Sequence, residues 1–261
     1  MLAFLSSLPL IAASLSGGAD IKFRPPGRVT VVGGVHGNEY TGVWCVKSLE
    51  RRLEATQRKY GSLTIDHLIA NPEAHLANRR FLDIDLNRQF SQKALVEQEA
   101  KGIEGKRARE IDALLGPKFG ADTGPATDCI IDLHSTTANM GLTLIFPEGD
   151  ALMGRACAYA LLKCTSGKTR ILFEARSSRE QEPFLQSVAP HGLTIEVGPV
   201  PQGVLRHDAV ISTEEALDAA LDYLHRHNIQ PEIIDEKLKD IYKDGLVPCY
   251  LYKSKLAVSY H

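Results

Sequence analysis

Short apolar runs rich in β-branched residues alternate with longer amphipathic segments along most of the chain. A β-branched run bounded by glycine or proline predicts a buried strand, and apolar residues spaced three and four apart predict a helix. The expected strands cover residues 28–34, 62–72, 128–134, 141–146, 170–175 and 192–199. The expected helices cover residues 41–59, 107–117, 151–164 and 212–228. This alternation predicts an α/β fold, in which a central sheet carries helices on both faces.

Several of these elements have a local boundary signal. Asn71-Pro72 should end the second strand, and Gly116-Pro117 should end the charged helix expected at residues 107–117. Ser212 or Thr213, followed by acidic residues, is expected to cap the start of the last helix. Beyond about Pro231 the pattern weakens, and the remaining residues do not predict a second domain.

The composition narrows the class of protein. The 261 residues are 44% hydrophobic and 24% charged, with a net charge of −2, which is typical of a globular protein in water. This balance gives no reason to expect nucleic acid or an anionic membrane as a partner, whereas a homo-oligomer is compatible with it. The five cysteines form no C-x-x-C pair, which favours reduced thiols in a cytoplasmic compartment.

The N-terminal segment allows two interpretations. Residues 1–18, "MLAFLSSLPLIAASLSGG", form an apolar run of signal-peptide length followed by small residues, but no Lys or Arg precedes it. The run is short and rich in Ser and Pro for a membrane span. Residues 1–27 are therefore either a signal or transit segment or a disordered extension.

Polar side chains stand where predicted strands end. His36 and Glu39 follow the first strand, and His134 ends the third. In open α/β sheets, sites gather beyond the carboxyl ends of strands. Zinc accepts imidazole nitrogen and carboxylate oxygen, so these three residues form a candidate metal site. The pattern H-x-x-E alone is weak, because a lone histidine is more often a hydrogen-bonded structural residue. Three glycines would let the backbone turn sharply and approach the metal: Gly33, Gly34 and Gly37.

Two further acidic residues belong to the same strand ends. Asp132 could orient His134 from behind or simply face a helix. Glu196 ends the run "LTIE". The phosphate-loop pattern G-x-x-x-x-G-K-[ST], the dinucleotide pattern G-x-G-x-x-G and the nucleophile elbow G-x-S-x-G are all absent from the sequence.

Residues 79–90, "RRFLDIDLNRQF", interleave charged and apolar side chains. A solvated loop is one interpretation. The other is a segment held against a core, where an Arg beside an Asn can clamp a carboxylate, because the guanidinium offers a planar fork of donors.

Six motifs occur in one order: "GGVHGNEYTG", "NPEA", "RRFLDIDLNRQF", "RAREIDALLGPK", "DLHSTTANMG" and "IEVGPVPQGVLR". From about Val29 to Asn228 the chain resembles the aspartoacylase and aminoacylase-3 family. More distantly, it is similar to succinylglutamate desuccinylases and zinc carboxypeptidases. The resemblance implies a zinc carboxypeptidase-like fold with a mixed central sheet. It also implies one Zn²⁺ per chain and hydrolysis of an N-acyl amino acid, such as an N-acetyl amino acid, to a carboxylate and a free amino acid.

The resemblance also implies roles for individual residues. His36, Glu39 and His134 correspond to the zinc ligands, and Glu196 corresponds to the general base and acid. Arg80 corresponds to the group that stabilises the oxyanion. In the loop that follows, Asn87 and Arg88 correspond to the clamp on the substrate's α-carboxylate, and Asp85 corresponds to a residue that supports this loop.

The chain departs from the family pattern at two places. Aligning the Glu196 motif puts Gln186 where aspartoacylases have an Arg that holds the substrate's side-chain carboxylate, so the sequence does not rank acetyl-aspartate against acetyl-aromatic substrates. The tail also matches nothing in the family's β-rich C-terminal domain. We therefore expect an N-terminal extension (1–27), a catalytic domain (28–230) and a divergent tail (231–261).

Two alternatives to an N-acyl amino acid amidohydrolase stay open at this point. One is a zinc carboxypeptidase that acts on peptides. The other is a truncated homologue, weakly active or inactive, that still binds zinc.

Overall fold

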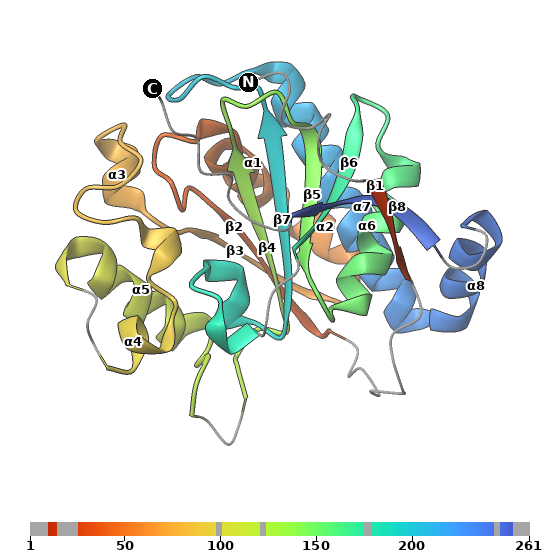
Figure 1. The fold of residues 1–261 in the computed structure, drawn as a ribbon, viewed down its shortest axis with the longest axis horizontal. Coiled ribbons are helices and arrows are strands. Elements are labelled where there is room, and N and C mark those ends of the chain that lie inside the picture. The colour runs from red at the N-terminus through yellow and green to blue at the C-terminus, as the bar shows by residue number, and fades with distance from the viewer. Residues whose placement is uncertain are drawn as a thin grey trace, which may run out of the picture.

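The computed structural model describes residues 10–14, 26–97, 101–120, 124–174, 179–242 and 246–252. These residues form an eight-stranded mixed sheet with helices on both faces, so the predicted α/β fold is confirmed (Figure 1). In spatial order its strands are β1 (Leu10–Ser14), β8 (Leu246–Tyr252), β6 (Thr169–Glu174), β5 (Gly141–Pro147), β7 (His191–Gly198), β4 (Cys129–Ser135), β2 (Arg28–Gly33) and β3 (Thr64–Ile69).

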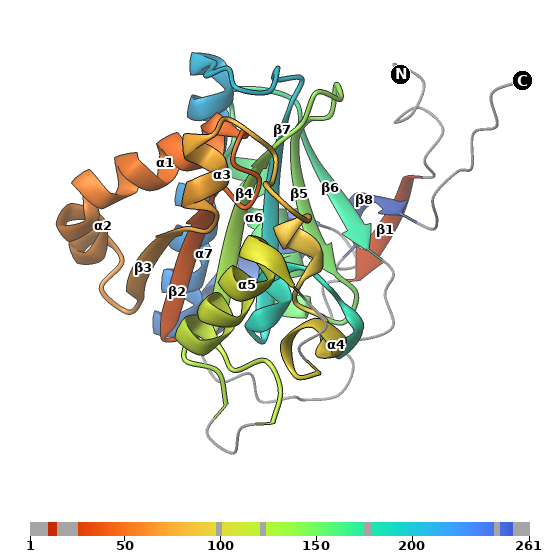
Figure 2. The same cartoon turned by 90° about the vertical axis from the view of Figure 1, so that its left-hand side faces the viewer.

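Strand direction decides which ends meet. β3, β2, β4 and β7 run parallel, and β5 pairs antiparallel with β7. β6 and β8 follow parallel to β5, and β1 closes the far edge antiparallel to β8 (Figure 2). The carboxyl ends of β2, β4 and β7 therefore meet at one edge of the sheet, beside the amino end of β5.

Helices cover the two faces unequally. One face packs against α1 (Tyr40–Arg51), α6 (Ala151–Lys163), α7 (His207–Ile229) and α8 (Pro231–Ile241), and α2 (Leu53–Lys59) follows α1. The other face packs against α5 (Gly102–Leu115) and the short elements η1 (Leu86–Arg88), α4 (Gln92–Leu95) and η3 (Leu185–Val188). Two more short elements lie in connections along the chain: α3 (Pro72–Leu76) between β3 and η1, and η2 (Arg179–Gln181) between β6 and η3. Side chains alternate between these two cores: Ile131 and Leu133 of β4 face the first, and Ile130 faces the second. His134 and Asp132 thus lie on the α5 face.

The predicted cap of the last helix is wrong. α7 begins at His207, and Ser212 and Thr213 lie within it. Their hydroxyls donate backward to the carbonyls of Asp208 (2.9 Å) and Ala209 (2.8 Å). Ser and Thr can make this bond inside a helix as readily as they cap one, so residue type alone did not locate the helix start.

Other boundaries differ by a few residues. The expected helix 41–59 is broken at Arg52 into α1 and α2. β3 ends at Ile69, and the Asn71 side chain instead caps α3, which starts at Pro72. The expected stop at Gly116 is confirmed, because α5 ends at Leu115.

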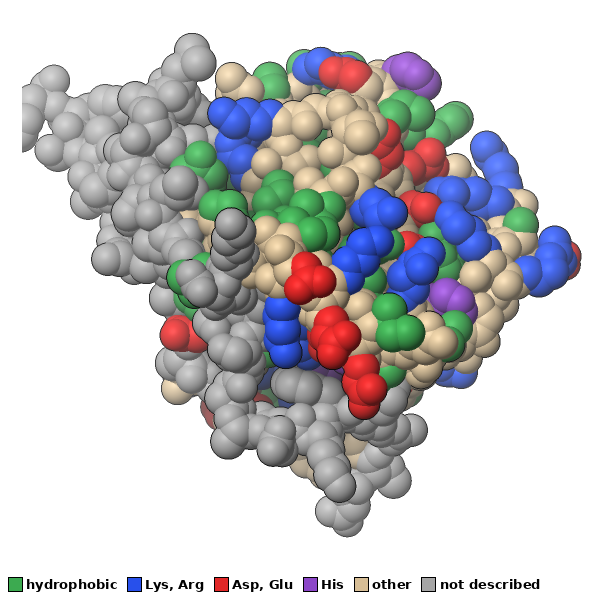
Figure 3. Space-filling view, turned by 90° about the vertical axis from the view of Figure 1, so that its right-hand side faces the viewer, with side chains coloured by type: hydrophobic (Ala, Val, Ile, Leu, Met, Phe, Trp, Pro, Cys, Tyr) green, Lys and Arg blue, Asp and Glu red, His purple; other side chains and the backbone are tan. Residues whose placement is uncertain are grey.

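Both terminal segments contribute to the sheet. β8 lies between β1 and β6, and α8 buries Ile234 and Leu238 in the core shared with α6 and α7. Most of the N-terminal segment considered as a signal or transit sequence lies outside the described residues. None of the helices in the described ranges combines the length and the apolarity needed to cross a membrane. On the side that lies to the right in Figure 1, acidic and basic side chains are interspersed (Figure 3).

The turn after β2 and the packing of α1 on β4 each require a glycine. Gly34 has a φ of +69°, a conformation that residues with a side chain rarely adopt. Gly42 lies in α1 directly against β4, where an added Cβ would stand 2.3 Å from the Leu133 carbonyl oxygen. α1 can therefore approach β4 closely only because Gly42 has no side chain.

Gly42→Ala should destabilise the protein by about 1–3 kcal/mol through overpacking, although Ala favours a helix by up to about 1 kcal/mol over Gly. Thermal unfolding measures the loss. Gly61→Ala is the matched control, because its nearest neighbour to an added Cβ is 3.9 Å away. An equal melting temperature for Gly42→Ala and the wild type would contradict the close approach of α1 to β4.

A buried carboxylate holds the irregular loop that follows α3. Glu104 of α5 has 0% exposure. Its Oε1 accepts from the Leu82 N–H (2.6 Å) and the Asn71 amide (3.2 Å). Its Oε2 accepts from the N–H groups of Asp83 (3.0 Å) and Ile84 (3.2 Å). Burial by itself would raise the pKa of Glu104, but these four donors outweigh it and lower the pKa. Loop 79–90 is thus fixed to α5 rather than solvated.

Glu104→Gln should lose about 1–3 kcal/mol of unfolding free energy at neutral pH, because an amide cannot accept all four bonds. Because the folded-state pKa lies below the ordinary 4.5, the carboxylate stabilises the fold above that pH and loses this effect as the pH falls. Urea unfolding at neutral pH and at about pH 3 should therefore show a smaller gap in acid. Glu110→Gln, on the exposed side of α5, is the control; a gap independent of pH would contradict the role of the Glu104 charge.

Candidate functional site

The three predicted metal ligands converge at the edge where β2 and β4 end. His36 lies in the turn after β2, Glu39 directly precedes α1, and His134 is in β4. One nitrogen or oxygen atom from each lies within 4.8 Å of the others, and each residue has 4% exposure. They meet because β2 and β4 are parallel and paired in register, with Gly33 opposite Leu133.

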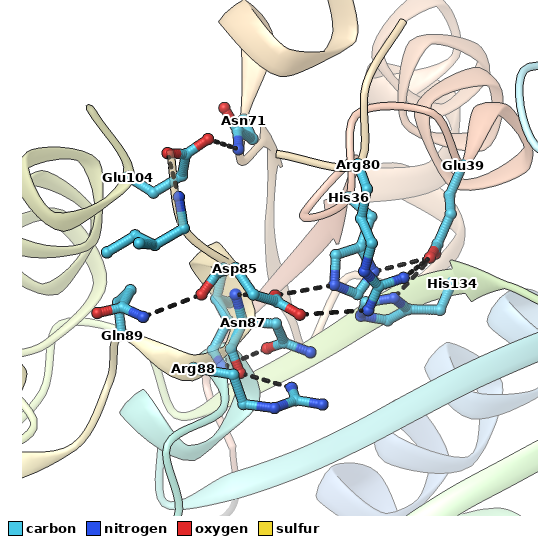
Figure 4. A network of polar contacts seen from close by, with 12 residues as sticks. His36, Glu39, Asn71, Arg80, Asp85, Asn87, Arg88, Gln89, Glu104 and His134 are labelled. Atoms are coloured by element: carbon cyan, nitrogen blue, oxygen red, sulfur yellow. Dashed lines mark hydrogen bonds and ion pairs between the residues drawn. The ribbon is translucent and has the colours of Figure 1, made fainter. Parts of the chain in front are cut away.

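The Glu39 carboxylate bridges the two imidazoles (Figure 4). Its Oε1 lies 2.7 Å from His36 Nδ1, and its Oε2 lies 3.0 Å from His134 Nδ1. Oε2 also accepts from the Ser135 N–H at 2.9 Å. Both rings therefore present the same nitrogen, Nδ1, to the same carboxylate.

The opposite nitrogen of each ring also meets a carboxylate. His134 Nε2 lies 2.9 Å from Asp132, and His36 Nε2 lies 3.1 Å from Asp85. A carboxylate on one ring nitrogen holds the proton there and leaves the lone pair of the other nitrogen free to bind a metal. Two such nitrogens and one carboxylate, all buried, match the donor set that zinc prefers in proteins. The residues therefore fit a metal ion, and Asp132 faces His134 rather than a helix.

Electrostatic attraction stabilises the charged forms of Glu39 and His134 in this buried site. Burial would raise the pKa of Glu39, but His134 and His36 lower it below its usual range. Burial would lower the pKa of His134, but Asp132 and Glu39 raise it well above its ordinary value. The pocket therefore favours positive charge between its carboxylates, whether a proton or a metal cation supplies it.

Asp85 connects the ligands to the loop. Besides meeting His36, it accepts from the Asn87 N–H (3.0 Å) and from Arg80 (3.3 Å). Arg80 also donates to Glu39 at 3.3 Å. The sequence assigned Asp85 to the loop alone, whereas the structure places it between the loop and a candidate ligand.

The two residues predicted to clamp a carboxylate are held from behind. Asn87 Oδ1 accepts from the Leu185 N–H at 3.0 Å. Arg88 donates to the Asn87 carbonyl at 2.9 Å, and its guanidinium carbon lies 4.6 Å from the centre of the Phe184 ring. Contacts with η3 and the segment before it thus orient both side chains.

These groups share one cavity of about 350 Å³. Every predicted site residue except Asp85 lines it. Gln186, which the family alignment placed in the substrate pocket, also lines it. The sequence did not assign the other lining residues to the site; these are Ser135, Thr136, Thr137, Ile145, Glu174, Phe184, Thr194 and Gln202. Only Thr194, two residues before Glu196 on the same strand face, could have been inferred from spacing.

Glu196 projects from β7 beside His134, its register partner in β4. Burial is the main cause that raises its pKa, and the nearby Glu39 adds to the effect while His134 opposes it. A carboxyl group with a raised pKa on a cavity wall is suited to accept and return a proton near neutral pH.

Comparisons with known proteins point to one family. Residues 25–224 match the succinylglutamate desuccinylase/aspartoacylase catalytic domain. An N-acyl-aromatic-L-amino acid amidohydrolase (carboxylate-forming) from Danio rerio is 38% identical over 208 residues, which cover 77% of this chain and 61% of that protein. A probable aspartoacylase from Nostoc sp. is 38% identical over 202 residues, which cover 77% of this chain and 65% of that protein. The chain thus spans less than two thirds of the length of either relative.

Solved structures agree with these sequence matches. The crystal structure of a mutant of murine aminoacylase 3 matches with a TM-score of 0.70 and 35% identity, over 79% of this chain and 66% of that one. A metallo-carboxypeptidase from Burkholderia cenocepacia shares the fold, with a TM-score of 0.53 and 14% identity over 87% of this chain and 68% of that one. The carboxypeptidase-like fold implied by the motifs is confirmed, and the chain belongs to the succinylglutamate desuccinylase/aspartoacylase family.

Proposed function

We propose that this protein is a zinc-dependent amidohydrolase that cleaves N-acyl amino acids, such as N-acetyl amino acids, to a carboxylate and a free amino acid. The observation that carries the proposal is the pair of imidazoles, each backed by a carboxylate, that faces Glu39 in a cavity shared with Glu196 and Arg88. The names of the relatives, an N-acyl-aromatic amino acid amidohydrolase and a probable aspartoacylase, support the same reaction class.

His36, Glu39 and His134 would hold one zinc ion. When bound, zinc acts as a Lewis acid and lowers the pKa of a coordinated water to about 7. Glu196 accepts the proton of the water as a C–O bond forms at the acyl carbon. It then donates that proton to the amine nitrogen as the C–N bond breaks, so no proton is gained or lost.

Two arginines bind the negatively charged groups of the substrate. Arg80, beside Glu39, stabilises the negative charge that develops on the acyl oxygen. Arg88, with Asn87, binds the α-carboxylate of the amino acid at the η3 side of the cavity. Residues 28–230 would form the catalytic unit, and Asp85 and Asp132 would orient the two histidines.

Elemental analysis of the purified protein should find about one zinc per chain, and His134→Ala should lose most of it. Asp132→Asn should keep the site but weaken zinc affinity by about 10- to 100-fold in a chelator competition, because the orienting charge is removed. His207→Ala, an exposed histidine of α7, is the control. Full zinc retention in His134→Ala would exclude His134 as a ligand.

Glu196→Gln is nearly isosteric, so it should retain zinc but lose turnover by about 10²–10⁴-fold. The assay is release of acetate from a panel of N-acetyl amino acids, and Glu236→Gln, at an exposed residue of α8, is the control. An unchanged rate in Glu196→Gln would remove the proton-transfer role. If the zinc-loaded wild type cleaves peptides and releases no acetate from the panel, the proposed function is wrong.

A further inference from the structure

A buried lysine lies behind the predicted clamp. Lys118 ends the motif "RAREIDALLGPK", which the proposed function leaves without a role, and it has 5% exposure. Its ammonium donates to the Phe90 carbonyl at 2.9 Å, to the Glu182 carbonyl at 2.5 Å and to the Ser187 hydroxyl at 2.8 Å. An ammonium has three N–H donors, so these acceptors use all of them.

The acceptors belong to two segments that are far apart in the sequence. Phe90 is the last residue of loop 79–90, and the other two acceptors lie at the ends of segment 182–187. The Phe90 N–H also donates to the Pro183 carbonyl at 3.0 Å. The Lys118 ammonium therefore joins the loop to segment 182–187 from inside the protein.

Segment 182–187 contacts both residues of the predicted clamp. The Leu185 N–H donates to Asn87 Oδ1 at 3.0 Å. The centre of the Phe184 ring lies 4.6 Å from the guanidinium carbon of Arg88. A shift of this segment would therefore displace the two side chains that are expected to bind the α-carboxylate.

The bonds of Lys118 depend on its charge. Burial is the main cause that lowers the pKa of Lys118 from its ordinary value to about 8, and the neighbouring Arg179 lowers it further. Three acidic groups around the ammonium oppose this shift, namely Glu182, Glu180 and Asp112. A neutral amine has only two N–H groups, so above that pH one of the three acceptors loses its donor. The attachment of segment 182–187 should therefore weaken as the pH rises through about 8.

We propose that Lys118 is a positioning residue, which holds segment 182–187 against the loop and thereby sets the grip of Asn87 and Arg88 on the α-carboxylate of a substrate. The inference rests on the proposed function and adds to it a group outside the cavity wall. A purely structural role would lower the stability of the fold without singling out the carboxylate. The expected effect of losing the ammonium is therefore on carboxylate binding rather than on turnover.

The test compares the N-acetyl amino acid of the panel that is cleaved fastest with the N-acetyl amine that lacks only its carboxylate. Lys118→Met keeps an unbranched side chain but removes the donors. It should raise the KM of the acid about tenfold, keep kcat within about threefold, and leave the inhibition constant of the amine unchanged. Ser187→Ala removes a single acceptor and should give a smaller rise in the same KM. Lys106→Met, at an exposed residue of α5, is the control.

The pH dependence of the wild type gives a readout that needs no variant. The KM of the acid divided by the inhibition constant of the amine should rise between about pH 7 and about pH 9, on either side of the Lys118 pKa. In Lys118→Met this ratio should stay constant, because the titrating group is absent. A constant ratio in the wild type, or an equal rise in Lys118→Met, would overturn the inference.

Ligand-induced thermal stabilisation separates this inference from the proposed function. If no compound of the panel is cleaved, the acid that stabilises the wild type most is used. Should that acid stabilise Lys118→Met less than the wild type, while the amine stabilises both equally, the proposed function fails and the role of Lys118 stands. If acetate is released but Lys118→Met binds the acid as the wild type does, or weakens acid and amine equally, the function stands and the inference is overturned. Absence of any carboxylate-dependent stabilisation or cleavage in the wild type would also overturn it.

Discussion

The parallel pairing of β2 with β4 is the constraint on which the site depends. It sets Gly33 opposite Leu133, so the turn that carries His36 and Glu39 opens beside His134. Gly42 lets α1 pack directly on β4, and the Glu39 carboxylate, at the start of that helix, then spans the two imidazoles. The pairing of two strands thus gathers candidate metal ligands that are almost a hundred residues apart, and side-chain charge completes the arrangement.

A second buried carboxylate, Glu104, holds the loop in place, as Glu39 holds the imidazoles of the two candidate ligands. Glu104 collects three backbone N–H groups and one amide, which fixes residues 82–84 against α5. Asp85 then connects the fixed loop to His36 and Arg80. Because a buried carboxylate is stable only when its oxygens are satisfied, each anchor specifies one loop position. For the proposed amidohydrolase, this rigidity would set the positions of the reacting groups before a substrate binds.

The cavity divides its charges between two ends. Arg80 and Arg88 stand near the candidate ligands and the clamp, whereas Glu174 and Gln186 line another part of the wall. The family includes proteins named for aspartate, succinylglutamate and aromatic amino acid substrates, so the shared ligands do not determine the side chain that is accepted. Under the proposed function, the selectivity for the substrate side chain would therefore lie with cavity residues other than the candidate ligands and the clamp.

The sequence by itself determined the α/β class, most strands, and the motifs that assign the chain to its family, because hydrophobic period and residue order are local properties. It misplaced the start of α7, since a Ser or Thr hydroxyl can cap a helix or bond backward within one. It did not single out Glu104, because a Glu in a charged helix is expected at the surface until loop 82–84 folds onto it. Only the tertiary structure decided that Asp85 reaches His36, that β8 joins the sheet beside β6, and that Gln186 is buried with no donor to its Oε1 among the described residues. Each of these depends on which distant segments pack together, and that information does not reside in any single stretch of residues.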